Sequence, residues 1–147
     1  MRAALGLAVL LAIGSAGRAD AACTVTATAV AFGSYDVFAA GPTDSTGTII
    51  YRCAPSDHDI RIAISAGSSG TYTNRTLKRS TDNLLYNLYY NGFTQVWGDG
   101  SNGTTTYYIK NPPNNQDVTL VVFGRITAAQ DVGAGNYTDT VVVTLEY

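Results

Sequence analysis

The sequence predicts an all-β fold, an antiparallel sandwich or barrel of about seven short strands. β-Branched and aromatic residues alternate with polar ones along most of the chain, which is the period of a strand with one buried face. Clusters rich in Gly, Pro, Asn and Asp interrupt these runs, and such clusters form turns. Because no linker or internal repeat divides the chain, one folded domain is expected.

The first 21 residues are predicted to be a secretory signal peptide. Arg2 precedes an apolar run over residues 3–13, and the small residues Ala19 and Ala21 precede the expected cleavage site. A helix needs roughly 20 apolar residues to span a bilayer, and this run has only about 11. The expected mature domain therefore covers residues 22–147.

Each expected strand follows from its alternation. The strands are expected at residues 24–30 (TVTATAV), 48–53 (TIIYRC), 59–65 (DIRIAIS), 84–90 (LLYNLYY), 104–110 (TTTYYIK), 117–126 (DVTLVVFGRI) and 137–147 (YTDTVVVTLEY). In the third run Ile60, Ile62 and Ile64 share one face, which is expected to point inward. Residues 39–47 (AAGPTDSTG) are expected to form a turn, since Gly and Pro dominate turns.

Cys23 and Cys53 are predicted to form one disulfide. Both follow the export signal, and an even number of cysteines in an oxidising compartment is typical of disulfides. Cys23 shares parity with Val25, and Cys53 shares parity with Tyr51, so the bond should join adjacent core-facing strands. Two thiols and a single histidine make a poor metal site, and we expect neither a metal nor a cofactor.

The last expected strand raises the question of what covers it. Its apolar residues are Tyr137, Val141, Val143, Leu145 and Tyr147, and the chain ends on the last of them. An open edge on such a strand is an aggregation hazard that proteins normally blunt or cover. Either a partner or another part of the chain could cover it.

Composition and motifs argue against several functions. The formal net charge is −2 with only two lysines, so nucleic-acid binding is not expected. Residues 56–59 (SDHD) place a histidine among carboxylates, but a hydrolase triad normally converges from separate elements, so we expect a solvated turn and no enzyme. Residues 99–103 begin like a calcium loop, yet Lys110 stands where the bidentate Glu belongs. Trp97, Tyr107 and Tyr108 could form a sugar- or surface-binding hairpin, although such residues are more often core or cross-strand pairs.

The expected mature chain as a whole resembles the spore coat protein U domain family, the domain of archaic (Csu-type) chaperone–usher pilins. The motifs that carry the resemblance are CTVTATAVAFGSYD (23–36), GTIIYRC (47–53), SAGSSGTYTNRTLKR (65–79), LYNLYYN (85–91), VWGDGSNGT (96–104), VFGRI (122–126) and AAQDVGAGNYTDTVVVTLEY (128–147). Each motif is loose alone, whereas their order and spacing together are specific.

The resemblance implies an immunoglobulin-like sandwich that lacks its final strand. A groove between its first and last strands would hold a segment of a periplasmic chaperone and later a donor strand of another subunit, with an outer-membrane usher as a further partner. The residues expected at this groove are Val25, Ala27, Tyr137, Val141, Val143, Leu145 and Tyr147. The protein is then expected to pass through the periplasm to a surface fibre, with a role in adhesion and biofilms, or to be secreted.

One feature departs from the family pattern. Structural pilins carry an apolar donor segment before the first cysteine, and cleavage after Ala21 leaves a single residue there. The sequence therefore predicts a subunit that accepts a strand without donating one, as a fibre tip or cap would. The alternative is a secreted coat or carbohydrate- and surface-binding module that is self-complemented or dimeric.

Overall fold

Nine strands in two sheets make up the part of the protein that our computed structural model describes, residues 23–147. The expected signal peptide lies outside these residues. The larger sheet contains β1 (Thr24–Ala27), β2 (Thr43–Arg52), β4 (Arg75–Arg79), β5 (Asp82–Tyr90), β6 (Gln95–Val96) and β8 (Val118–Ile126). The smaller sheet contains β3 (Ile60–Ile64), β7 (Tyr107–Ile109) and β9 (Val143–Glu146). A 3-10 turn, η1 (Gly67–Ser69), follows β3.

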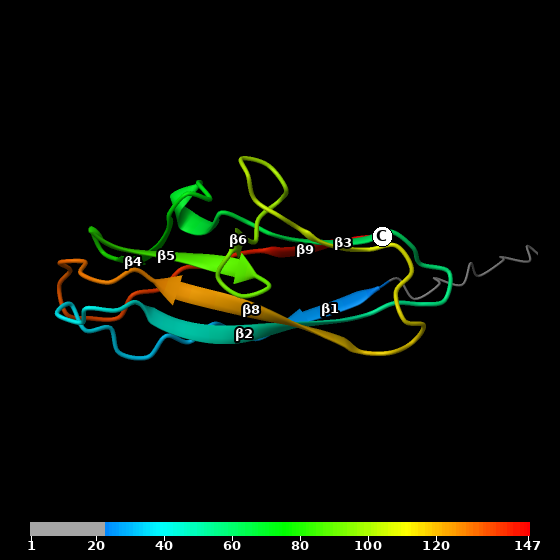
Figure 1. Ribbon diagram of the computed structural model, residues 1–147, viewed down its shortest axis with the longest axis horizontal. Coiled ribbons are helices and arrows are strands. Elements are labelled where there is room, and N and C mark those ends of the chain that lie inside the picture. Colours follow the sequence, from blue (N-terminus) through cyan, green and yellow to red (C-terminus); the bar gives the residue numbers. More distant parts are fainter. Residues whose placement is uncertain (1–22) are drawn as a thin grey trace, which may run out of the picture.

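The two sheets lie as layers of a sandwich (Figure 1). The order of strands is β1-β2-β8-β5-β4 in the larger sheet, with β6 beside β5, and β7-β3-β9 in the smaller one. Neighbouring strands in both sheets are antiparallel. This architecture confirms the predicted all-β sandwich. No helix within residues 23–147 is long and apolar enough to cross a membrane.

The core lies between the sheets and follows the predicted alternation. Ile60, Ile62 and Ile64 are all buried from β3, while Arg61 and Ala63 between them are not. Ile49 and Tyr51 face them from β2. Burying an isoleucine side chain contributes about 1.5–3 kcal/mol, so these contacts are the main force holding the layers together.

The expected turn at residues 39–47 is wrong in its second half, because β2 already begins at Thr43. The glycine that suggested a turn, Gly47, serves a close approach of two backbones instead. A Cβ atom at Gly47 would lie 2.8 Å from the carbonyl oxygen of Thr28. Only glycine lets the segment after β1 lie this close to β2.

The C-terminal strand is shorter than predicted and borders both sheets. Thr138 exchanges two backbone hydrogen bonds with Lys78 of β4, and only Val143–Glu146 then pairs with β3. The core-facing position expected for Tyr147 is wrong, because its side chain is 59% exposed beyond the end of β9.

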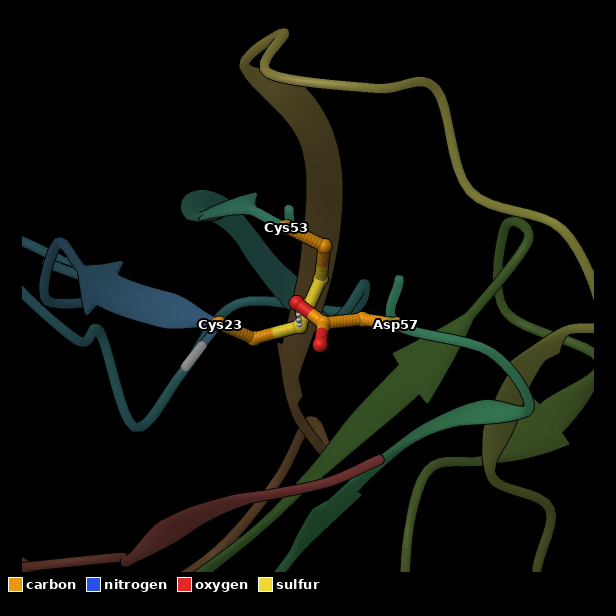
Figure 2. A group of neighbouring side chains, drawn as sticks. All are labelled: Cys23, Cys53 and Asp57. Carbon is orange, nitrogen blue, oxygen red and sulfur yellow. Dashed lines mark hydrogen bonds between the residues drawn. A yellow bond between two sulfur atoms is a disulfide. The ribbon is translucent and has the colours of Figure 1, made fainter. Parts of the chain in front are cut away.

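The predicted disulfide is confirmed. Cys23 and Cys53 are bonded at the adjacent ends of the paired strands β1 and β2 (Figure 2). The Asp57 carboxylate lies 3.4 Å from Cys23 Sγ and accepts a hydrogen bond from the Ala54 amide. Although the sulfurs and Asp57 lie within 4.8 Å of one another, the disulfide leaves no thiolate to bind a metal.

Candidate functional site

An open, mostly apolar groove runs between the segment after β1 and the segment before β9. It consists of two cavities of about 290 and 940 Å³. The residues that line both cavities are Ala29, Val30, Phe32, Leu77 and Asp139. The floor of the smaller cavity comes from both layers, with Ile49 and Val122 from the larger sheet and Ile64 from the smaller one. The groove therefore opens directly onto the hydrophobic core.

One wall of the groove is the free edge of β1. The amide of Thr28 donates to the carbonyl of Thr48, which places the even-numbered residues of this segment in hydrogen-bonded pairs with β2. Antiparallel pairs alternate, so the backbone groups of the odd-numbered residues Val25 and Ala27 point to the open side. β1 has no second neighbour among the described strands.

The opposite wall is the free edge of the C-terminal segment. The Ser65 amide donates to the Val142 carbonyl, and Thr138 pairs with Lys78, so the even-numbered residues again face the sheet partners. By the same alternation, the backbone groups of Val141, Val143 and Leu145 point away from β3. Two edges with unpaired backbone groups thus border one apolar groove.

Arg75 ties β4 to the end of β3, where Ile64 lines the smaller cavity. The Arg75 side chain is fully buried, and its guanidinium donates hydrogen bonds to the carbonyls of Ser65, Ile64 and Trp97 and to Asn87 Oδ1. Burial lowers the pKa of this guanidinium from its usual value. Because the Ser65 carbonyl is occupied by Arg75, the Val142 amide donates to Ser65 Oγ instead, at 2.8 Å. The ladder between β3 and β9 extends no further as a regular strand pair, and the C-terminal segment continues toward β4.

Asp139 is the one carboxylate among the described residues that line the smaller cavity. Its Oδ2 accepts a hydrogen bond from the Tyr86 hydroxyl at 2.7 Å, and its Oδ1 accepts from the amides of Ser68 and Thr140. Burial and the neighbouring carboxylate raise the pKa of Tyr86 well above its usual value, so the hydroxyl remains a donor. A Cβ at Gly67, where φ is +69°, would collide with the carboxylate. The side chain is therefore held in one position.

The predicted groove residues fall into two groups. Ala27, Val141 and Val143 line the smaller cavity, and Tyr137 lines the larger one. Val25 and Leu145 line neither cavity, but both pack against the core on the two strands whose edges are open.

Sequence reasoning missed Val30, Phe32, Arg75 and Asp139. Phe32 packs edge-to-face on Tyr86 with ring centroids 5.9 Å apart, and Val30 fills the space above Gly124. The alternation of residues 24–30 could not have found them, because it puts Val25 and Ala27 on the inward face, whereas Val30 and Phe32 have the parity of the outward threonines. Nothing in the local sequence marks Arg75 or Asp139, because their partners come from distant strands.

The structure favours the core and cross-strand alternative for the aromatic residues of this hairpin over a sugar-binding surface. Trp97 is fully buried, and its indole N–H donates to the Ile62 carbonyl, so its ring cannot stack on a sugar. Tyr107 faces the core side, where its hydroxyl shares a hydrogen bond with Tyr51. Tyr108, half exposed on the other face of the same strand, is hydrogen-bonded to Asp59. These three aromatic residues therefore form no common surface.

The fold and this groove define a class of protein, a disulfide-bonded β-sandwich with an open, core-deep groove between its terminal segments. The pattern of the Spore Coat Protein U domain matches residues 11–144, and the protein belongs to that family. This confirms the predicted resemblance. None of the curated proteins matches the sequence.

Among solved structures, the chain is similar to the crystal structure of the CsuC–CsuE chaperone–tip adhesion subunit pre-assembly complex from archaic chaperone–usher Csu pili of Acinetobacter baumannii. The TM-score is 0.54 at 25% sequence identity. The similarity covers 85% of this chain but only 39% of the chain it matches, so this protein spans well under half of that length.

Proposed function

We propose that this protein is a subunit of a chaperone–usher surface fibre, completed by a β-strand that another polypeptide inserts into the groove. The single observation that carries the proposal is the groove itself, in which two open strand edges border the exposed core. The similarity to a chaperone–subunit complex supports it.

The physical reason is that one inserted strand would satisfy both needs of the groove. Its backbone would pair with the open groups of Val141, Val143 and Leu145, and its alternate side chains would cover Ile49 and Ile64. Without such a strand, the unpaired edge beside apolar side chains is a site of aggregation.

The proposal includes three partners and a location. A periplasmic chaperone would fill the groove first, an outer-membrane usher would receive the complex, and a companion subunit would donate the final strand at the cell surface. That the chain accepts a strand without donating one, as a tip or cap, stays a prediction. It depends on the segment before Cys23, which lies outside the described residues.

Expression of the full chain in a bacterial periplasm, alone and together with the chaperone CsuC, tests the proposal. We expect the chain alone to aggregate or be degraded, and a soluble one-to-one complex to form with the chaperone. Hydrogen exchange decides the case if CsuC does not bind. Slow exchange at the amides of Val143 and Leu145 in a stable lone monomer would show that the edge is already covered and would refute the proposal.

A further inference from the structure

The groove carries one feature that an apolar strand does not explain. Asp139 lies where the two cavities meet, with Val141 and Val143 on one side of it and Tyr137 on the other. All four are odd-numbered residues of the C-terminal segment, whose backbone groups face the groove. A strand inserted alongside them would place a side chain of its own beside the Asp139 carboxylate.

The carboxylate has acceptor capacity left for that side chain. An ionised carboxylate has about four acceptor sites, and Tyr86, Ser68 and Thr140 use three of them. In the open groove, water can donate a hydrogen bond to the remaining acceptor site of the carboxylate. Insertion of a strand removes that water, and an apolar side chain there would leave the charged group short of a hydrogen bond.

The surroundings of Asp139 indicate which kind of donor fits. Most residues that line the smaller cavity are apolar, with Val30, Phe32 and Val141 among them. A lysine or arginine inserted there would lose its hydration while a single acceptor site remained to receive it. A neutral hydroxyl satisfies the remaining acceptor site without adding charge.

We propose that the groove selects a strand of another polypeptide that carries a serine or threonine beside Asp139, with apolar residues at the inward positions on either side. This inference rests on the proposed function, because it names the chemistry of the strand that the groove would accept. It makes Asp139 a specificity-determining residue rather than a merely structural one.

A competition experiment tests the inference on the unmodified chain. The oxidised protein, residues 22–147, is refolded with an equimolar mixture of two peptides of about nine residues, the length of a long strand. Both carry valine or leucine at alternate inward positions and differ only at the central one, which is threonine or valine. The inward pattern reads the same in both directions, so the result does not depend on strand orientation. Native mass spectrometry measures the amount of each peptide bound.

We expect the threonine peptide to be bound roughly tenfold more than the valine peptide, the ratio for one buried acceptor left unsatisfied. A third peptide has the composition of the threonine peptide, but its threonine is moved to the next inward position. It should compete for the groove no better than the valine peptide does. In Asp139→Leu the preference should reverse.

The outcomes separate the two proposals. Equal binding of the threonine and valine peptides by the unmodified chain would overturn the selectivity while leaving strand uptake intact. Binding of neither peptide by the folded chain would overturn the proposed function as well. A dimer that excludes both peptides would identify a second copy of the chain as the occupant, against the inference.

Discussion

Arg75 is the residue on which the interior of the sandwich most depends. It belongs to β4 in the larger sheet, yet its guanidinium binds carbonyls at the end of β3 in the smaller one. Arg75→Met would leave these carbonyls without side-chain donors in a dry interior, although Asn87 Oδ1 would keep the Leu88 amide, so we expect the free energy of unfolding to fall by roughly 3 kcal/mol or more. Urea unfolding measures it. Arg61→Met is the matched control, since that side chain is exposed and should change stability by less than about 0.5 kcal/mol.

The disulfide supplies a second prediction at this scale. The bond closes a loop between residues 30 positions apart and ties the start of β1 to the end of β2. Cys53→Ser should lower the free energy of unfolding by about 2–5 kcal/mol, chiefly because the unfolded chain gains freedom. Unmodified protein unfolded in the presence of a reductant should show the same loss. Peptide mapping that found two free thiols in exported protein would contradict the prediction.

At the scale of single elements, β9 and the residues before it present two faces of opposite character. Val143 lines the groove, whereas the side chain of its neighbour Val142 is 60% exposed. Val143→Asp would place a carboxylate among apolar side chains, and we expect it to abolish binding of the threonine peptide and capture by a chaperone. Val142→Asp adds the same charge outside the groove and should bind normally. Equal behaviour of the two variants would show that the groove is not the binding surface.

The elements also show how far the sequence could be interpreted. Alternation predicted the strands around Ile60–Ile64 and Leu84–Leu88 correctly, because a buried face leaves a periodic signal in neighbouring residues. The turn at residues 39–47 failed because a glycine required for close packing resembles one required for a turn. For Trp97 the sequence left both a surface and a core position open, because periodicity does not say how deep a short strand lies. Asp139 and Arg75 were invisible, since their roles depend on contacts across 53 and 22 residues of sequence.

For the molecule as a whole, the disulfide fastens the start of β1 to the end of β2, whereas the two layers stay open along the groove. The two strand edges that border the groove belong to the first and the last strands of the described chain. A strand added after β9 could therefore pass back beside β9 if a flexible linker lets it turn. Such a linker spans roughly 5–6 Å times the square root of its residue number, so a short one is sufficient.

We therefore expect the threonine-centred segment, fused after Tyr147 through a Gly- and Ser-rich linker, to complete the fold within one chain. The linker holds the segment at an effective concentration in the millimolar range. At about a thousandfold excess over the dissociation constant, strand insertion adds about 4 kcal/mol to the free energy of unfolding. For a domain of this size that raises the melting temperature by about 10 °C or more. Calorimetry measures the shift, and hydrogen exchange should show new protection at Val141, Val143 and Leu145. The control is the same fusion with aspartate at the inward positions, which should melt like the unfused chain. If both fusions melt with the unfused chain and these three amides are already protected there, the groove is filled from within and the protein needs no donor.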